Sequence, residues 1–224
     1  WEEPPISGTR GSGTIFFSGC SLGCVFCQNE KISRRDFGKP VTMARLRAIC
    51  QELVDQGAHN LNFVNPTHYA HSLRELLETW RPPVPVVWNS GGYDRVETLR
   101  SLEGLVDIYL PDLKYLDSGA AARYSGAPDY PETAAAAIRE MVRQTGPCQL
   151  GGDGLLKRGT VIRHLILPGQ VGGAKAVMDW TAGEFEPGTV LFSLMSQYTP
   201  WGDLERYPEI RRRLRTSEMR AARE

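Results

Sequence analysis

Short apolar segments alternate with amphipathic segments along most of this 224-residue chain, and the alternation limits the folds that it can adopt. Six segments have the length and the β-branched or aromatic residues typical of strands. They are residues 13–19, 61–65, 84–89, 105–110, 160–169 and 189–195. Because a helical segment separates most of them, the connections are long enough for parallel crossovers. The pattern predicts about six βα units and a parallel sheet that is either open or curled into a partial barrel.

The segments between the strands have the apolar spacing of helices packed by one face. Residues 41–57 place Leu46, Leu53 and Val54 on one face, and Gly57 is a stop signal. A further helix opens at Pro131, a residue suited to a first helical position, and ends at Gly146. Other expected helices are residues 68–80, 94–102 and 173–183, and the glycine-rich residues 144–159 predict a loop.

Composition and charge argue against several classes of protein. The chain has 26 Lys and Arg against 26 Asp and Glu, so it has no electrostatic footprint for nucleic acid or an anionic membrane. It has no apolar run long enough to span a bilayer and no signal peptide, and five cysteines favour a reduced, cytoplasmic protein over a disulfide scaffold. Because the chain begins with Trp1, we expect residues 1–13 to be a truncated N-terminal extension.

Three of the five cysteines lie in one short loop after the first strand, in the stretch CSLGCVFC. Thiolates of Cys20, Cys24 and Cys27 can hold three corners of a [4Fe–4S] cluster and leave one iron open to another ligand. Structural zinc needs a fourth protein ligand, for which Cys148 is the plausible recruit. Cys50 lies on the apolar face of an expected helix and looks like a core residue. Spacing alone favours the cluster and leaves zinc, or no metal, as alternatives.

Polar residues at the carboxyl ends of the strands form the second candidate feature, because parallel α/β folds place their sites there. Asp112 and Lys114 follow the fourth strand and share one face, for which a surface ion pair is the alternative. The other polar residues are Thr67 and His68 after the second strand, Asn89 and Ser90 after the third, Arg163 and His164 in the fifth, and Gln197 after the sixth. A structural histidine at position 68 and a glycine-rich turn at 89–92 are the alternatives.

With these motifs the chain resembles the radical S-adenosylmethionine (SAM) superfamily, most closely the group related to pyruvate formate-lyase activating enzyme. The resemblance rests on C-x-x-x-C-x-x-C after the first strand, with Phe26 before the last cysteine. It extends over nearly the whole chain through "NPTHY", "VDIYLPDLKY", "YSGAPDY", "RHLILPG" and "LMSQYTP". It implies a single-domain partial (β/α)6 TIM-like barrel with parallel strands over residues 1–224. The Arg-rich run at 208–224 itself predicts a solvated terminal helix.

The resemblance also implies a chemistry and a site. Cys20, Cys24 and Cys27 would hold a [4Fe–4S] cluster, and a flavodoxin- or ferredoxin-like donor would reduce it. SAM on the open iron would be cleaved to methionine and a 5′-deoxyadenosyl radical, which abstracts hydrogen from a substrate. The residues expected to bind SAM are Phe26, Thr67, His68, Asn89, Ser90, Asp112, Lys114, Arg163 and Gln197, with a monovalent cation near Asp112.

Two positions depart from the family pattern. Asn65-Pro66-Thr67-His68 stands where radical SAM enzymes usually carry a Gly-Gly-Glu type motif, and Asn89-Ser90 stands where the activating enzyme has an acidic and a hydroxyl residue. Three functions therefore stay open. They are activation of a glycyl radical enzyme, radical modification of another peptide or a small molecule, and a non-catalytic metal-stabilised binding or electron-transfer module.

Overall fold

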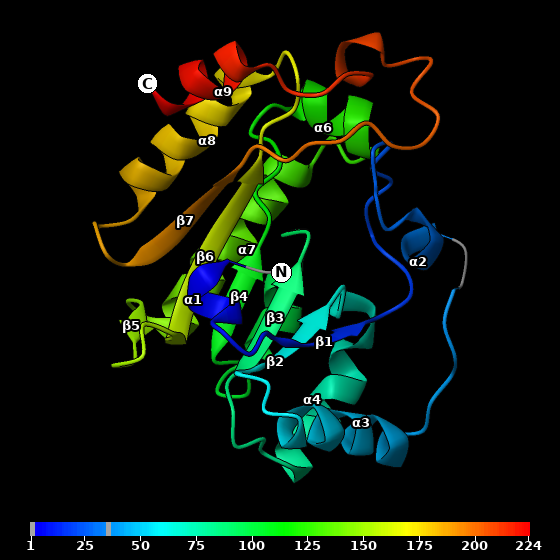
Figure 1. Ribbon diagram of the computed structural model, residues 1–224, viewed down its shortest axis with the longest axis vertical. Coiled ribbons are helices and arrows are strands. Elements are labelled where there is room, and N and C mark those ends of the chain that lie inside the picture. Colours follow the sequence, from blue (N-terminus) through cyan, green and yellow to red (C-terminus); the bar gives the residue numbers. More distant parts are fainter. Residues whose placement is uncertain (1–2, 35–36) are drawn as a thin grey trace.

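The computed structural model describes residues 3–34 and 37–224; Trp1 and Glu2, the start of the expected extension, lie outside the described residues. Six parallel strands form one sheet in the order β1-β2-β3-β4-β6-β7 (Figure 1). Their bounds are β1 Gly13–Phe16, β2 Leu61–Val64, β3 Val86–Ser90, β4 Ile108–Pro111, β6 Leu156–Leu165 and β7 Val190–Met195. The predicted parallel α/β fold is confirmed.

The sheet is a partial barrel. In the part of the chain that the structure describes, β1 pairs only with β2 and β7 only with β6, so the two outer strands do not close the ring. A short additional strand, β5 (Gln149–Leu150), pairs antiparallel with the beginning of β6. The barrel therefore keeps one open side between β1 and β7.

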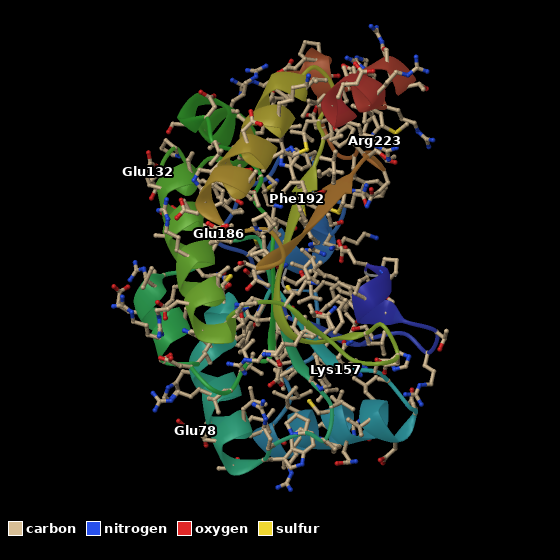
Figure 2. All side chains as sticks on the ribbon, turned by 90° about the vertical axis from the view of Figure 1, so that its left-hand side faces the viewer. Glu78, Glu132, Lys157, Glu186, Phe192 and Arg223 are labelled. Carbon is tan, nitrogen blue, oxygen red and sulfur yellow. The ribbon has the colours of Figure 1, made fainter. Side chains whose placement is uncertain are left out.

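The helices that follow the strands run in the opposite direction to them. Their bounds are α3 Met43–Asp55, α4 Ala70–Thr79, α5 Val96–Arg100, α6 Ser118–Ser125, α7 Tyr130–Thr145 and α8 Val171–Glu184. Figure 2 shows Lys157, near the start of β6, low in the view, together with Glu78 near the end of α4. Glu132, near the start of α7, lies high in the same view. The strands thus end at the upper end of the molecule, where the polar strand-end residues gather.

Local signals set the ends of the helices. The side chain of Thr42 caps α3 by accepting a hydrogen bond from Arg45 N at 3.2 Å. Asp117 caps α6 in the same way by accepting from Ala120 N at 2.6 Å, and α6 ends at Gly126 in the left-handed conformation. Pro131 lies in the first turn of α7, as expected.

Alternation along the strands separates an outer core from an inner one. Outward-facing residues such as Phe63, Trp88 and Tyr109 are fully buried beneath the helices. On the inner face, Val87, Ile108, Leu110 and Val161 pack against Ile6 from α1 (Pro4–Ser7), which is 1% exposed. Figure 1 shows α1 in front of the sheet, beside β4 and β6. The start of the chain therefore fills the lower interior of the barrel with apolar side chains.

Two expectations need correction. Residues 144–159 are not a loop throughout, because β5 and the beginning of β6 lie within them. Residues 208–224 are not one helix but a 3-10 turn, η2 (Pro208–Ile210), and a separate helix α9 (Thr216–Arg223). The carboxylate of Glu218 accepts a hydrogen bond from the backbone nitrogen of Arg215 at 2.9 Å and so starts α9 anew. Within residues 3–34 and 37–224, no helix has the length and hydropathy needed to span a membrane.

The loop between β1 and α3 carries the cysteines and the short helix α2 (Glu30–Arg34). It runs across the upper end of the barrel toward α6 (Figure 1). Gly23 N donates to Ser125 O and Val25 N donates to Tyr124 O, both at 2.9 Å. The cysteine loop is therefore tied through its backbone to the end of α6.

Candidate active site

A cavity of about 320 Å³ lies between the cysteine loop and the carboxyl ends of the strands. Ten of the twelve residues expected to bind the cluster or SAM line it. These are Cys20, Cys24, Phe26, Cys27, Asn89, Ser90, Asp112, Lys114, Arg163 and Gln197. They come from the loop after β1 and from the ends of β3, β4, β6 and β7, so the fold brings together residues up to 177 positions apart.

The three cysteines of the loop enter the cavity with different surroundings. Cys24 is buried, whereas Cys20 and Cys27 are half-buried, and none forms a disulfide. Cys20 Sγ accepts a hydrogen bond from Leu22 N at 3.5 Å, and burial raises the pKa of its thiol. Cys24 Sγ lies 3.0 Å from the hydroxyl of Ser125, and Cys27 Sγ lies 3.5 Å from that of Ser33.

A charged cluster of Asp112, Lys114 and Arg163 faces the thiols. Asp112 Oδ2 lies 2.6 Å from Lys114 Nζ, and its Oδ1 lies 2.9 Å from Arg163 Nη2. Arg163 Nη2 also donates to Asn89 Oδ1 at 2.7 Å. Between 14% and 21% of each charged side chain is exposed, so the cluster is largely removed from water.

The charges of this cluster support one another. Burial opposes ionisation of Asp112, but the neighbouring Arg163 and Lys114 outweigh it and hold the pKa of the carboxyl below its ordinary value. Burial likewise acts to lower the pKa of Lys114, and the charge of Asp112 reverses this and raises it. Two cations and one carboxylate leave one net positive charge, which suits an anionic group of a ligand. The monovalent cation expected beside Asp112 would compete with both protein cations.

Thr67 and His68 lie elsewhere than expected. They do not line the large cavity but a small adjoining pocket of about 10 Å³ that also contains Cys20. The hydroxyl of Thr67 donates to Asp94 Oδ1 at 2.7 Å, and that of Ser90 donates to Asp94 Oδ2 at 2.5 Å. The protons of both hydroxyls are thus directed away from the cavity, toward a carboxyl that the sequence analysis did not single out.

Asp94 ties the loop after β2 to the loop after β3. Its side chain is fully buried, and burial raises the pKa of the carboxyl against the hydrogen bonds from Ser90 and Thr67. Nothing in the local pattern NSGGYD distinguishes it from an exposed aspartate near a helix start. The role depends on Thr67, 27 residues earlier, and so is visible only in the tertiary structure.

Tyr130 performs a similar task between the loops after β3 and β4. Its hydroxyl accepts from Lys114 N at 2.9 Å and lies 2.7 Å from Asp112 O and 2.9 Å from Gly91 O. The side chain is fully buried. Gly92 completes the contact: its φ is +77°, and a Cβ there would lie 2.1 Å from Asp112 O.

Asn65 lines both pockets and was not among the expected site residues. It is the sole non-glycine residue with positive φ, at 55°, in the ranges 3–34 and 37–224. Its backbone nitrogen donates to Asn89 O at 3.0 Å. Asparagine tolerates the left-handed conformation better than most residues, so Asn65 can turn the chain sharply at the cavity wall.

The side of the cavity near β7 is more apolar. Leu165, Met195 and Tyr198 line it beside Phe26 and Gln197. The rings of Phe26 and Tyr198 meet edge to face with centroids 5.9 Å apart, and the Tyr198 hydroxyl donates to Ile210 O at 2.7 Å. The segment after β7 thereby packs against the cysteine loop at one edge of the cavity.

The donor set fits a [4Fe–4S] cluster. Three free thiols from one loop enter one cavity, and a cubane binds each thiolate to a different iron. Side chains of His, Cys, Asp and Glu do not converge in threes on a single metal position anywhere in the described residues. Cys148 lies beside the middle of β6, where its Sγ contacts Thr160 O at 3.5 Å. It does not line the cavity that the other three thiols enter, so the fold does not bring it there as a fourth ligand.

A comparison with known families agrees with this donor set. Residues 7–117 match a family model described as a 4Fe-4S single cluster domain. An uncharacterized protein of Methanocaldococcus jannaschii, MJ0674, is 31% identical over 222 residues. The match covers 94% of this chain and 60% of that protein, so this chain spans somewhat less than two thirds of its relative.

Solved structures share the fold at low sequence identity. SuiB of Streptococcus suis bound to its precursor peptide SuiA superposes with a TM-score of 0.58 at 12% identity, covering 94% of this chain and 44% of SuiB. SuiB bound to S-adenosylmethionine superposes with a TM-score of 0.51 at 16% identity, covering 85% of this chain and 40% of SuiB. Methylornithine synthase (PylB) superposes with a TM-score of 0.58 at 14% identity, covering 97% of this chain and 63% of the synthase. These likenesses establish the architecture.

Proposed function

We propose that this chain is a radical SAM enzyme, with residues 1–224 forming its catalytic domain. The observation that carries the proposal is the shared cavity: three free thiols of one loop and the cluster of Asp112, Lys114 and Arg163 face the same space. The match to a 4Fe-4S domain and the fold shared with SAM-bound SuiB support it. When bound, the [4Fe–4S] cluster supplies the electron that splits SAM into methionine and a hydrogen-abstracting 5′-deoxyadenosyl radical.

The residues of the chain bind and orient in this proposal. Cys20, Cys24 and Cys27 hold three irons. The net positive charge of the Asp112–Lys114–Arg163 cluster attracts the carboxylate of SAM. Asn89, held by Arg163, presents its amide to the cavity.

The adenosine part of SAM belongs on the apolar side of the cavity. Phe26, Met195 and Tyr198 offer apolar surface there, and Gln197 offers an amide for the base. Thr67 and Ser90 act indirectly, because their hydroxyl protons go to Asp94. His68 stays at the rim of the adjoining pocket beside Cys20.

We propose a polypeptide substrate over a small molecule. The barrel is open between β1 and β7, so an extended segment can reach the cavity from the side. SuiB, which shares the fold, has been solved with a bound precursor peptide. Activation of a glycyl radical enzyme is one reaction of this class, with a flavodoxin- or ferredoxin-like protein as the electron donor.

Anaerobic reconstitution tests the proposal. We expect about four irons per chain, and release of 5′-deoxyadenosine when the reduced protein meets SAM. Cys24→Ser should lower the iron content and abolish cleavage, because it removes one corner ligand. The matched control Cys148→Ser should keep both the iron content and the cleavage of SAM. Stoichiometric zinc without iron, or an intact cluster that never cleaves SAM, would contradict the proposal; the second result would favour a binding or electron-transfer module.

A further inference from the structure

The last residue of α6, Ser125, lies against the sulfur of one cysteine of the loop. Its hydroxyl oxygen is 3.0 Å from Cys24 Sγ and 3.0 Å from the hydroxyl of Tyr115. Ser125 is 1% exposed, Tyr115 6% and Cys24 8%, so the three groups form a chain that is largely shielded from water. Neither Ser125 nor Tyr115 is among the residues that the sequence predicts for the site.

The backbone holds this contact in register. Gly23 N donates to Ser125 O, and Val25 N donates to Tyr124 O, on either side of Cys24. The end of α6 is itself set by Gly126, whose left-handed conformation stops the helix one residue after Ser125. The backbone of Cys24 therefore cannot move away from the end of α6 without breaking two backbone hydrogen bonds.

Chemistry sets the direction of the hydrogen bonds once Cys24 binds iron. A thiolate has no proton, so the Ser125 hydroxyl must be the donor to the sulfur. The serine oxygen then accepts from Tyr115, whose proton has no other partner in this chain of contacts. A hydroxyl that is both donor and acceptor is polarised, which strengthens its donation to sulfur.

The other two cysteines are in different surroundings. Cys27 Sγ and the hydroxyl of Ser33 are 3.5 Å apart, and Cys20 Sγ accepts from the backbone of Leu22 at 3.5 Å. Of the three contacts, the one to Cys24 is the shortest. Donors to cluster sulfurs stabilise the reduced, more negative form and so raise the reduction potential.

We propose that Ser125, supported by Tyr115, is a positioning residue that raises the reduction potential of the cluster by donating a hydrogen bond to the Cys24 sulfur. The proposal rests on the proposed function for the presence of the cluster, but not on SAM cleavage. It assigns α6 the task of tuning how readily the external donor reduces the protein.

The test is a redox titration of the reconstituted full chain and its variants, with iron content and thermal midpoint measured on the same samples. For Ser125→Ala we expect the ratio of reduced to oxidised cluster at a fixed potential to fall about tenfold, a shift of about 59 mV to lower potential for one electron. Tyr115→Phe should shift in the same direction by less, because it leaves the serine donor in place. Ser125→Thr, which keeps a hydroxyl, should restore the wild-type potential.

Two controls separate tuning from general destabilisation. Thr181→Val removes a buried hydroxyl that donates to Val177 O within α8, and Tyr109→Phe removes one that donates to Gln144 at 2.6 Å. Both should leave the potential unchanged. A Ser125→Ala protein with full iron content and the wild-type potential would overturn the proposal.

If Ser125→Ala does not retain its iron, the Tyr115→Phe variant tests the proposal instead. A lowered reduction potential in Tyr115→Phe supports the hydrogen-bonded chain from Tyr115 through Ser125 to Cys24, and an unchanged potential overturns the proposal. A wild-type chain that takes up no cluster overturns this proposal together with the proposed function. An intact cluster with the expected shift but without SAM cleavage contradicts only the proposed function.

Discussion

Asp112 shows, at the scale of one residue, why we assign the charged cluster to the proposed site and not to the stability of the fold. Each of its carboxylate oxygens faces a different cation, and all three side chains are largely buried. Desolvation of buried ions offsets much of their attraction, so such clusters contribute little net stability. Breaking one partner, in contrast, leaves an uncompensated charge. A costly cluster facing three thiols is better explained by a charged ligand.

Glu140 lies outside the site, and its ionisation makes the stability of the protein depend on pH. Its side chain is 5% exposed and accepts hydrogen bonds from Arg143 and Gln144. The hydrogen bond from Arg143 outweighs burial and lowers the pKa of the Glu140 carboxyl to about 2. A lowered folded pKa stabilises the protein above the ordinary value of about 4.5, and this stabilisation is lost as the pH falls from there toward 2.

We expect the wild type to melt at a higher temperature than Glu140→Gln at pH 7, with the difference shrinking between pH 4.5 and 2. Thermal unfolding followed by circular dichroism across this range checks it. Glu103→Gln is the matched control, since Glu103 contacts the same Arg143 but is 52% exposed and should matter less. A difference that stays constant down to pH 2 would contradict the assignment.

At the scale of elements, the junction between the ends of β3 and β4 depends on Gly92. Its positive φ disfavours any side chain, and a Cβ would lie 2.1 Å from Asp112 O. Tyr130 spans the same junction from α7, so three elements meet where Asp112 and Lys114 leave the sheet. The close approach of the two loops is what places the charged cluster.

Gly92→Ala should therefore cost clearly more free energy of unfolding than Gly104→Ala. Gly104 has nearly the same φ, +79°, but nothing within 4 Å of its Cβ position. We expect Gly104→Ala to lower the free energy of unfolding by about 1 kcal/mol through backbone strain alone. Gly92→Ala should lower it by at least about twice as much, because the backbone at Asp112 must move to make room for the Cβ. Urea unfolding of both variants measures the difference, and equal costs would show that the junction yields easily.

At the scale of the whole molecule, α1 connects the start of the chain to the barrel interior. Ile6 packs on inner residues of β3, β4 and β6, and its carbonyl accepts a hydrogen bond from Asn60 at 2.8 Å. The segment expected to be an extension is thus part of the core. The polar cavity above and the apolar filling below divide the interior into two layers.

Ile6→Ala should destabilise the protein by about 2–4 kcal/mol, because it leaves a cavity in the lower layer. Iron uptake by the folded variant should be unchanged, since Ile6 does not line the upper cavity. Chemical unfolding and iron analysis check both. Val41→Ala, at a side chain 49% exposed, is the control and should change stability by about 0.5 kcal/mol or less. An Ile6→Ala protein as stable as this control would mean that α1 is not part of the cooperative core.

Local pattern determined much of the fold and part of the candidate site. The six parallel strands follow from segment length and residue type, and the alternation that places Asp112 and Lys114 on one face follows from strand geometry. The cysteines are close in sequence, so one loop is enough to bring them together. These features depend on the type and order of neighbouring segments and not on contacts between distant side chains.

Only the tertiary structure decided the rest, because it depends on contacts between distant segments. Thr67 and Ser90 were expected to face SAM, but Asp94 takes both of their protons. Ser125 lies against Cys24, 101 positions earlier, and Tyr130 joins two loops that it follows by many residues. A sequence pattern shows which side chains leave a strand end. Which partner each one meets there is set by how the loops pack, and that is a property of the whole fold.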